Sequence, residues 1–336
     1  MGKKRLLLCL VAAAAAGMGG CANLAPVKGY ADKSVAFLGQ EEVGQLAIDS
    51  ARRMEDYHEL RLKLCSQVTG KDCGKVLEPA GPKVTAQQMI EEANQAGRVL
   101  ISLQDALFAY LEAVALLAAD QKLTDDAPIN NLLNQLKNLP QLADLQNEVA
   151  LAKKLLNLLV GPAVTHYRRQ HLEEIMTKAD PLVRRLTQGL AKYLKTSLAG
   201  KLVNYEKGVM LNYYNGVLVF SVLDVPCKVW AKAYGEREKG VGPKAVVGMQ
   251  RSCVAAGWAN RTMLISVFDK EKTAKQRELE RHKTCLMAKA AFLERIGECH
   301  GAALEFLRKD IGAPDPPKWA TCQRALQAPS PCAVGQ

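Results

Sequence analysis

Ten cysteines are the residues of this sequence with the clearest chemical potential. Two lie within the first 21 residues, and the other eight are Cys65, Cys73, Cys227, Cys253, Cys285, Cys299, Cys322 and Cys332. Cysteines bind metals, act as nucleophiles or pair into disulfides. The eight contain no CxxC pair, and their spacings match no zinc module. An even number of such cysteines is typical of disulfides in an exported protein.

The strongest case for a metal site comes from two histidines beside cysteines. His282 lies three residues before Cys285, and His300 directly follows Cys299. On one continuous helix Cys285 and Cys299 are about 21 Å apart, at a rise of 1.5 Å per residue. At that distance they can neither share a metal ion nor bond each other. We therefore predict structural disulfides and no metal site.

The predicted disulfides are Cys65–Cys73, Cys227–Cys253, Cys299–Cys322 and Cys285–Cys332. The first closes a short loop that turns at Gly70. The last two follow from an antiparallel return, in which a proline-rich tail runs back along the helix that carries Cys285 and Cys299. Cys322 then meets the nearer cysteine and Cys332 the farther one. The chain between Cys322 and Cys332 covers about 21 Å easily when it is extended.

Other catalytic signals are missing from the sequence. It has no GxSxG, HExxH, P-loop or GxGxxG motif. No two histidines are four residues apart, and the five are His58, His166, His171, His282 and His300. The acidic pairs Glu91–Glu92 and Glu173–Glu174 diverge by about 100° on a helix, which is typical of solvated surface and not of an acid–base dyad. We predict no catalytic, cofactor-binding or metal-binding residues, and hence no enzyme.

The first 20 residues have the layout of a secretory signal. Lys3, Lys4 and Arg5 form a basic head, and residues 6–16 form an apolar body too short to span a bilayer. Small residues follow directly before Cys21. Cys9 leaves with this segment when it is removed.

Residues 18–21, Met-Gly-Gly-Cys, resemble the lipobox of bacterial lipoproteins, with Met18 where that family usually has Leu. The resemblance implies cleavage before Cys21 and lipidation of that cysteine on its sulfur, as with palmitate, and on its nitrogen. Several acyl chains anchor a protein firmly, because each buried methylene contributes about 0.8 kcal/mol. Ala22, in place of the Asp that retains such proteins in the inner membrane, implies the outer membrane, facing the periplasm. The resemblance covers only these 21 residues.

The charge of the chain restricts its partners. The 45 basic and 34 acidic residues give a net charge of +11. Loss of the three basic residues of the signal leaves 42 basic residues and a net charge of +8. This charge suits anionic lipid headgroups, an acidic partner or an ordinary solvated surface. No basic patch interleaved with aromatic residues occurs, so we expect no nucleic-acid partner.

Periodic apolar residues predict the elements that carry these groups. We expect helices over residues 34–64, 85–119, 129–140, 142–160, 163–223, 245–268 and 270–309. The apolar helix 85–119 contains Gln104, Asp105 and Glu112, so we interpret it as a buried bundle helix and not as a membrane span. Residues 163–223 form either one helix of about 90 Å or a bent or folded-back pair. At Asp180–Pro181 we expect a kink or restart, with Asp180 as the N-cap.

The predicted fold class is all-α, an elongated multi-helix bundle with long helices, braced by disulfides. Residues 217–223 are the one strand alternative, and residues 226–243 are expected to be a loop. An interruption is expected near Gly257. Residues 312–336 are proline-rich and are expected to form an extended C-terminal strap. The predicted organisation is a signal peptide over 1–20, a lipidated tether over 21–33, an N-terminal helical part over 34–160 and a long-helix, cysteine-rich part over 161–336, with the two parts also able to form one continuous domain.

These features favour a membrane-tethered helical scaffold that binds an envelope protein. The alternatives are a periplasmic inhibitor or immunity protein, a carrier of lipid or another apolar ligand, and an envelope hydrolase whose site is assembled from distant residues. The aromatic candidates for a docking surface are Trp230, Trp258 and Trp319, since tryptophan is enriched among binding hot spots.

Overall fold

A computed structural model describes residues 24–40, 43–69, 86–119, 121, 127–160, 168–217, 243–308 and 317–326. Every regular element in these ranges is helical and none is a strand, which confirms the all-α fold class. The helices are α1 (Ala25–Gln40), α2 (Val43–Thr69), α3 (Ala86–Ala118), α4 (Ala127–Lys137), α5 (Gln146–Asn157), α6 (Arg168–Tyr193), α7 (Val203–Val217), α9 (Pro243–Arg308) and α10 (Pro317–Ala325). A 3₁₀ turn, Ala143–Leu145, precedes α5, and a π-helical segment, Leu194–Leu202, joins α6 to α7.

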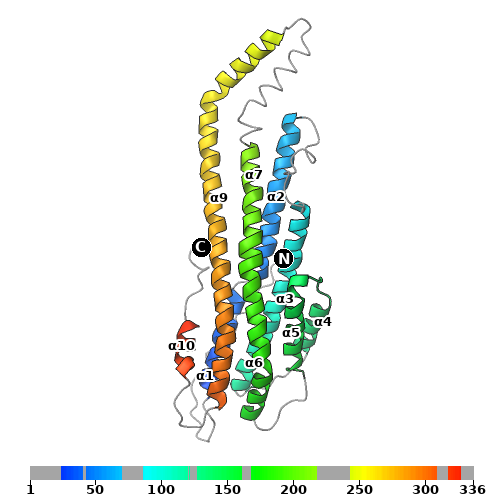
Figure 1. The fold of residues 1–336 in the computed structure, drawn as a ribbon, viewed down its shortest axis with the longest axis vertical. Helices are drawn as coiled ribbons and strands as arrows, with labels where there is room; N and C mark the ends of the chain where they lie inside the picture. Colours follow the sequence, from blue (N-terminus) through cyan, green and yellow to red (C-terminus); the bar gives the residue numbers. More distant parts are fainter. Residues whose placement is uncertain are drawn as a thin grey trace.

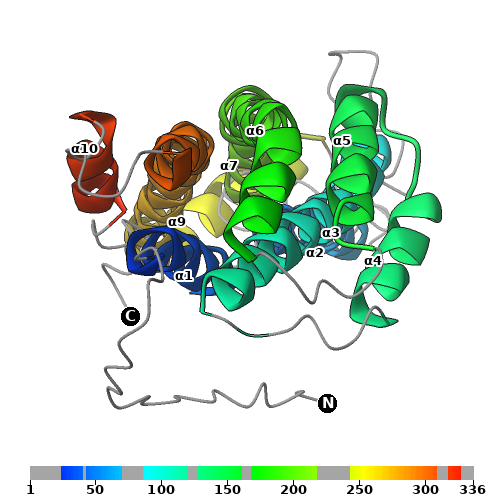
Figure 2. The same cartoon turned by 90° about the horizontal axis from the view of Figure 1, so that it is seen from below.

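The long helices form an up-down-up-down bundle. The chain rises through α1 and α2, descends through α3, rises through α6 and α7 and descends through α9 (Figure 1). Cross-bundle ion pairs give the antiparallel register of α9 on α6 and α7, from Arg308–Glu173 at one end to Lys207–Glu280 farther along. Seen along the bundle, α10 lies outside α9, and α4 and α5 lie at the opposite edge (Figure 2).

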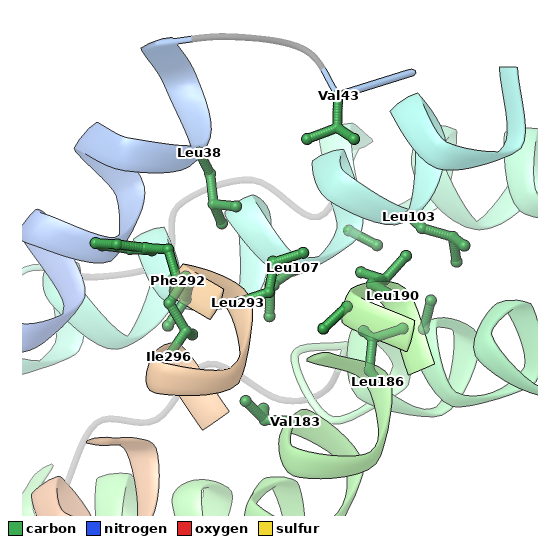
Figure 3. Packing of buried hydrophobic residues seen from close by; sticks show 14 of the residues in the cluster. Leu38, Val43, Leu103, Leu107, Val183, Leu186, Leu190, Phe292, Leu293 and Ile296 are labelled. Carbon is green, nitrogen blue, oxygen red and sulfur yellow. The ribbon is translucent and has the colours of Figure 1, made fainter. Parts of the chain in front are cut away.

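The core follows from the spacing of apolar residues. One row of buried residues on α6 has alternating spacings of four and three, the pattern of a heptad seam. The row consists of Leu172, Met176, Ala179, Val183, Leu186 and Leu190. Leu293 and Ile296 of α9 continue the core that this seam faces. Figure 3 shows Leu38 of α1 and Leu107 of α3 converging on the same core. The helices therefore bury their apolar faces together in one cluster.

The first predicted helix, 34–64, is divided into α1 and α2 in the structure. Gln104 of α3 lies opposite the division. Its side-chain oxygen accepts the Val43 backbone N–H at 3.0 Å, and its amide donates to the Leu38 carbonyl. Helix ends leave such backbone groups without partners inside the helix. One buried carboxamide thus satisfies a free carbonyl at the end of α1 and a free N–H at the start of α2.

The tether predicted over 21–33 is wrong for the part that the structure describes. α1 begins at Ala25, and Val27, Tyr30 and Ala31 are at most 2% exposed. The Tyr30 hydroxyl donates to the Ile296 carbonyl of α9 at 3.2 Å. This contact with a distant helix stabilises a segment whose own sequence has weak periodicity.

Residues 168–217 form one unbroken helical rod, so the folded-back alternative for this region is wrong. Pro181 lies inside α6, and Asp180 is therefore not an N-cap. A proline inside a helix removes one backbone hydrogen bond. The part of α6 that precedes Pro181 is held to α9 by two contacts, Arg308 with Glu173 and His300 with Asp180. The strand alternative at 217–223 lies almost entirely outside the described residues.

α9 also differs from expectation, because its backbone stays helical past Gly257 as one element, although the helix bends sharply near its N-terminal end (Figure 1). Its 66 residues correspond to about 99 Å of helix. The extended strap is wrong at its centre, where α10 is helical from Pro317. Trp319 of α10 is 2% exposed and packs on Phe306. Proline suits the first turn of a helix, because the N–H that it lacks would have no partner there. The rest of the predicted strap and the loop 226–243 lie outside the described residues.

The apolar helix predicted over 85–119 corresponds to α3. Its length and composition would allow it to cross a membrane, but 61% of its most apolar window is buried within the protein. It packs against α1, α2 and α5. These contacts agree with the interpretation of α3 as a bundle helix.

The crossing of α2 and α3 depends on two glycines. A Cβ added to Gly44 would lie 2.2 Å from the Gly97 carbonyl oxygen and 2.9 Å from the Ile101 backbone nitrogen. A Cβ added to Gly97 would lie 2.7 Å from the Gly44 carbonyl oxygen. Backbone on one side meets backbone on the other, so a side chain here would force the helices apart. Gly208 of α7 has nothing within 4 Å of its added Cβ.

We expect Gly44→Ala to lower the free energy of unfolding by about 1–3 kcal/mol, the cost of overpacking a close contact. Gly208→Ala is the matched control and should raise it by up to about 1 kcal/mol, because alanine favours the helix. Urea unfolding followed by circular dichroism measures both. Equal effects of the two substitutions would show that the α2–α3 crossing is not close-packed.

Candidate functional site

The most chemically suggestive group in the structure is a buried imidazole in α9. His300 is 0% exposed and lies between α3 and α6. Its Nε2 is 2.7 Å from the Tyr110 hydroxyl, and its Nδ1 is 2.9 Å from Asp180 Oδ1. The ring of Tyr30, from α1, meets the imidazole edge-on at 6.1 Å. Side chains from four helices therefore meet at one histidine.

The outer end of this network reaches solvent. The Asp180 side chain is 21% exposed, and its Oδ2 accepts a hydrogen bond from Arg184 Nε at 2.9 Å. Tyr110, at the inner end, is 0% exposed. Arg184–Asp180–His300–Tyr110 is thus one continuous hydrogen-bonded chain from the surface into the core, which we call the His300 network.

The electrostatics of the network assign its protons. Burial lowers the pKa of His300 despite the opposing effect of Asp180, so the imidazole is neutral. An ionised carboxylate only accepts, so Nδ1–H donates to Asp180 and Nε2 accepts from the Tyr110 hydroxyl. Burial raises the pKa of Tyr110 and of Tyr30. Partial burial raises the pKa of Asp180, but hydrogen bonds from His300 and Arg184 outweigh it and leave that pKa below its ordinary value.

A carboxylate that orients a histidine toward a hydroxyl is an arrangement used in nucleophilic catalysis. Such chemistry requires the substrate to reach the hydroxyl. Here the hydroxyl-bearing Tyr110 and His300 have no exposed surface. The raised pKa of Tyr110 also works against an attacking phenolate. In this structure the arrangement joins α3, α6 and α9.

A second polar network lies farther along the bundle. Glu206 of α7 is 1% exposed and binds Arg53 of α2 in bidentate fashion, with Nε–Oε1 at 2.5 Å and Nη2–Oε2 at 3.1 Å. The Ser50 hydroxyl donates to the same carboxylate. His282 of α9 contacts Arg53 at 3.3 Å, and burial followed by the Arg53 charge lowers its pKa. This network joins α2, α7 and α9.

Sequence reasoning missed both networks. It treated His282 and His300 as candidate metal ligands and Asp180 as a helix cap. Within the described ranges no three His, Cys, Asp or Glu side chains gather as metal ligands. The available signal was the position of His300, which falls in the α9 apolar row between Ile296 and Ala303 and is therefore expected to be buried.

The remaining histidines and acidic pairs lie apart from the networks. His58 and His171 are half-buried on α2 and α6, and His166 lies outside the described residues. Glu91 and Glu92 lie on the exposed side of α3. In the other acidic pair, Glu173 binds Arg308 and Glu174 binds Lys178. The structure brings none of these residues into a common site.

One predicted disulfide is confirmed. Cys299 and Cys322 are bonded with their Cα atoms 5.4 Å apart, which fastens α10 to α9 as the antiparallel return requires. Cys285 is disulfide-bonded as well, and its predicted partner Cys332 lies outside the described residues. The side chains of the predicted pairs Cys65–Cys73 and Cys227–Cys253, and the lipidation site Cys21, also lie outside the described residues. These four assignments stay predictions.

A groove between α3 and α4 is an open hollow of about 620 Å³. Four of its eight lining residues carry carboxamides, and they are Asn131, Asn134, Gln135 and Asn138. Arg98 and Ser102 of α3 add further polar groups, and Ile101 and Leu139 are apolar. Carboxamides both donate and accept hydrogen bonds, as peptide groups do. These groups can exchange hydrogen bonds with the polar groups of a bound ligand. Trp319 is buried and so offers no docking surface, and the side chains of Trp230 and Trp258 lie outside the described residues.

Comparison with known proteins adds no relative. No protein family, no characterised protein and no solved structure matches the chain.

The His300 network predicts how stability depends on pH. The unfolded chain binds a proton at His300 near pH 6.5, whereas the folded chain holds the imidazole neutral to lower pH. Stability is therefore fully present above about pH 6.5 and is lost as the pH falls below it, by up to about 1.4 kcal/mol per pH unit for one proton. The lowered pKa of His282 adds a second loss of stability over the same pH range. The lowered pKa of Asp180 also makes stability fall with falling pH, but at more acidic pH.

We expect His300→Gln to lower the free energy of unfolding at pH 7.5 by about 1–3 kcal/mol, because a buried partner loses its hydrogen bond. The same change should make the loss of stability between pH 7.5 and pH 5 shallower. His171→Gln is the matched control and should change neither quantity. Urea unfolding across this range is the measurement, and an unchanged slope in His300→Gln would contradict the neutral, buried imidazole.

Proposed function

We propose that this chain is a lipoprotein, anchored in the outer membrane and facing the periplasm, that acts as a non-enzymatic helical scaffold and binds another envelope protein. The leader and Cys21 support the anchor and its location. The disulfide-bonded Cys285, Cys299 and Cys322 fit an oxidising compartment.

The observation that carries the proposal is the placement of the groups capable of chemistry. His300 and Tyr110 are 0% exposed, Glu206 is 1% exposed, and each network joins three or more helices. Polar groups arranged in this way specify helix register at the expense of reactivity. A rigid bundle with its polar chemistry inside supports binding over turnover.

The carrier alternative has less support in the bundle interior. The cavity lined by Phe37, Leu100 and Leu194 has a volume of about 20 Å³, enough for about one water molecule. Lipid chains do not fit there. The inhibitor and hydrolase alternatives have no specific observation in their favour.

The groove between α3 and α4 is the surface that suits a protein partner best. Its carboxamides can pair with an extended backbone, and Arg98 can bind a carboxylate of the partner in bidentate fashion. The Arg98 side chain is 60% exposed, and Glu91, with which it forms an ion pair at 3.9 Å, is equally exposed. A weak surface pair of this kind costs little to replace. We therefore assign an acidic, extended segment of an envelope protein to this groove.

Cys21→Ala should release the protein from the membrane, because the acyl chains that anchor it are attached to this residue. Fractionation of cells into membrane and soluble periplasmic material measures the change. Wild-type protein recovered unmodified in the soluble periplasmic fraction would refute the anchor. Cys9→Ala is the control and should leave the mature protein on the membrane.

A photo-crosslinking residue placed at Asn134 should capture a discrete partner in intact cells, because Asn134 lines the groove. The same residue at Asn130, which is exposed on α4 but is not part of the groove, is the matched control. Arg98→Glu should reduce capture at Asn134 by about tenfold through loss of a charge-assisted contact. Equal capture at both positions, or no effect of Arg98→Glu, would reject the groove as the docking surface.

A further inference from the structure

A second hollow, which we call the α4–α5 pocket, lies where α4 turns into α5. It has a volume of about 290 Å³ and is backed by Val99 of α3. Eight of its twelve lining residues are apolar, including Leu136, Leu142 and Leu145. Leu136 and Leu145 are each 1% exposed, so the floor of the pocket is a fixed part of the core.

The four polar residues that line the pocket are all uncharged or basic. Gln141 and Gln146 can donate hydrogen bonds, and Lys137 and Lys153 carry positive charge. No acidic residue is among them. Neither of the nearest acids in sequence lines the pocket: Asp144 is exposed on the 3₁₀ turn, and Glu148 lies against Gly189 of α6. The potential at the mouth is therefore positive above an apolar floor.

Lys153 is the most informative of these residues. Gln146, Val149, Ala150 and Lys153 follow one another at helical spacing and so line the pocket along one face of α5. Lys153 is half-buried and, within the part of the chain that the structure describes, makes no hydrogen bond or ion pair. Lys137 contacts only the neutral Asn134, at 3.4 Å. Neither ammonium group is neutralised by an acidic partner in the described residues, so both are available to an anion.

We infer that the α4–α5 pocket binds an amphiphile with a single alkyl chain and an anionic head group. The alkyl chain contacts the leucine-lined floor, where it gains the free energy of apolar burial. The head group lies between Lys137 and Lys153, with the glutamine amides as further donors. The volume lies at the lower end of the range for small-molecule sites, which fits one chain and not two.

This site is independent of the proposed scaffold function. The pocket shares only Leu139 with the groove that we assign to a protein partner. It is also separate from the 20 Å³ interior cavity. A protein that fails to bind the amphiphile can still act as a scaffold, and a protein without a protein partner can still bind the amphiphile.

Photolabelling of the full chain in lipid nanodiscs tests the inference. The probes are dodecanoate, dodecyl phosphate and dodecanol, each with a diazirine at the far end of the chain, and labelled peptides are located by mass spectrometry. We expect the two anions to label the pocket about tenfold more than the alcohol, the difference expected for one charge-assisted hydrogen bond. The anion that labels the pocket to the greater extent identifies the head group as a carboxylate or a phosphate.

Three variants sharpen the test. Lys153→Gln should reduce labelling by the anions about tenfold and leave labelling by the alcohol unchanged. Lys154→Gln is the matched control, because Lys154 is exposed and is not among the lining residues. Ala150→Trp places an indole in the pocket from an exposed helical position and should block all three probes. Circular dichroism establishes that each variant is folded.

Several outcomes would overturn the inference. Equal labelling by the alcohol and the anions would remove the role of the lysines, and equal effects of Lys153→Gln and Lys154→Gln would do the same. Labelling outside the pocket would place the ligand elsewhere. Capture of a two-chain phosphatidylglycerol probe without either single-chain anion would make the pocket a membrane contact and not a site for a single-chain ligand.

Discussion

The register of this bundle depends on one neutral imidazole. His300 of α9 has one hydrogen-bond partner on α3 and another on α6, and the ring of a third residue, on α1, closes over it. Apolar side chains in a heptad seam allow a helix to slide by a turn with little change in contact area. A shift of one turn, about 5.4 Å, would break both hydrogen bonds of the imidazole at once. Each buried group left unpaired costs about 1–3 kcal/mol, so the network selects one register among several similar ones.

Apolar and polar residues have similarly distinct roles elsewhere in the bundle. Apolar rows supply the area that favours association, and single polar or small residues decide how the helices meet. Gln104 satisfies the ends of α1 and α2, Glu206 joins α2 to α7, and Gly44 with Gly97 sets the closest approach of α2 and α3. The disulfide between Cys299 and Cys322 then holds the short helix α10, which has little surface of its own to bury.

Periodicity made most helices predictable, because an apolar row at helical spacing identifies both the element and its buried face. The alternating row of α6 and the pairing of Cys299 with Cys322 belong to this class. Helix ends set by distant residues were not predictable. Tyr30 gains its partner 266 residues along the chain, and the helix that it stabilises has weak periodicity of its own. Pro181 is a local signal for a break that contacts from α9 override.

The polar site could be predicted only in part, for the same physical reason. The position of His300 in an apolar row indicates burial, but its partners lie 120 and 190 residues away, and periodicity does not say which residue on another helix faces it. The grooves and the pocket around α4 arise from the angle between helices, which no single segment encodes. The charge pattern of the α5 face is visible in the sequence, whereas the hollow beside it is not.

The π-helical segment Leu194–Leu202 has a consequence for the history of the chain. A π turn holds about one residue more than an α turn, so it absorbs an inserted residue without rotating the helix after it. Deletion of one residue within the segment would let it return to α-helix, with α6 and α7 still facing their present neighbours. Deletion of one residue in the regular α-helix on either side would instead turn α7 by about 100° relative to α6 and move Glu206 away from Arg53. The segment thus acts as a phase correction that keeps two halves of one rod in step with different neighbours, and length variants of this chain should be tolerated there and not elsewhere in the rod.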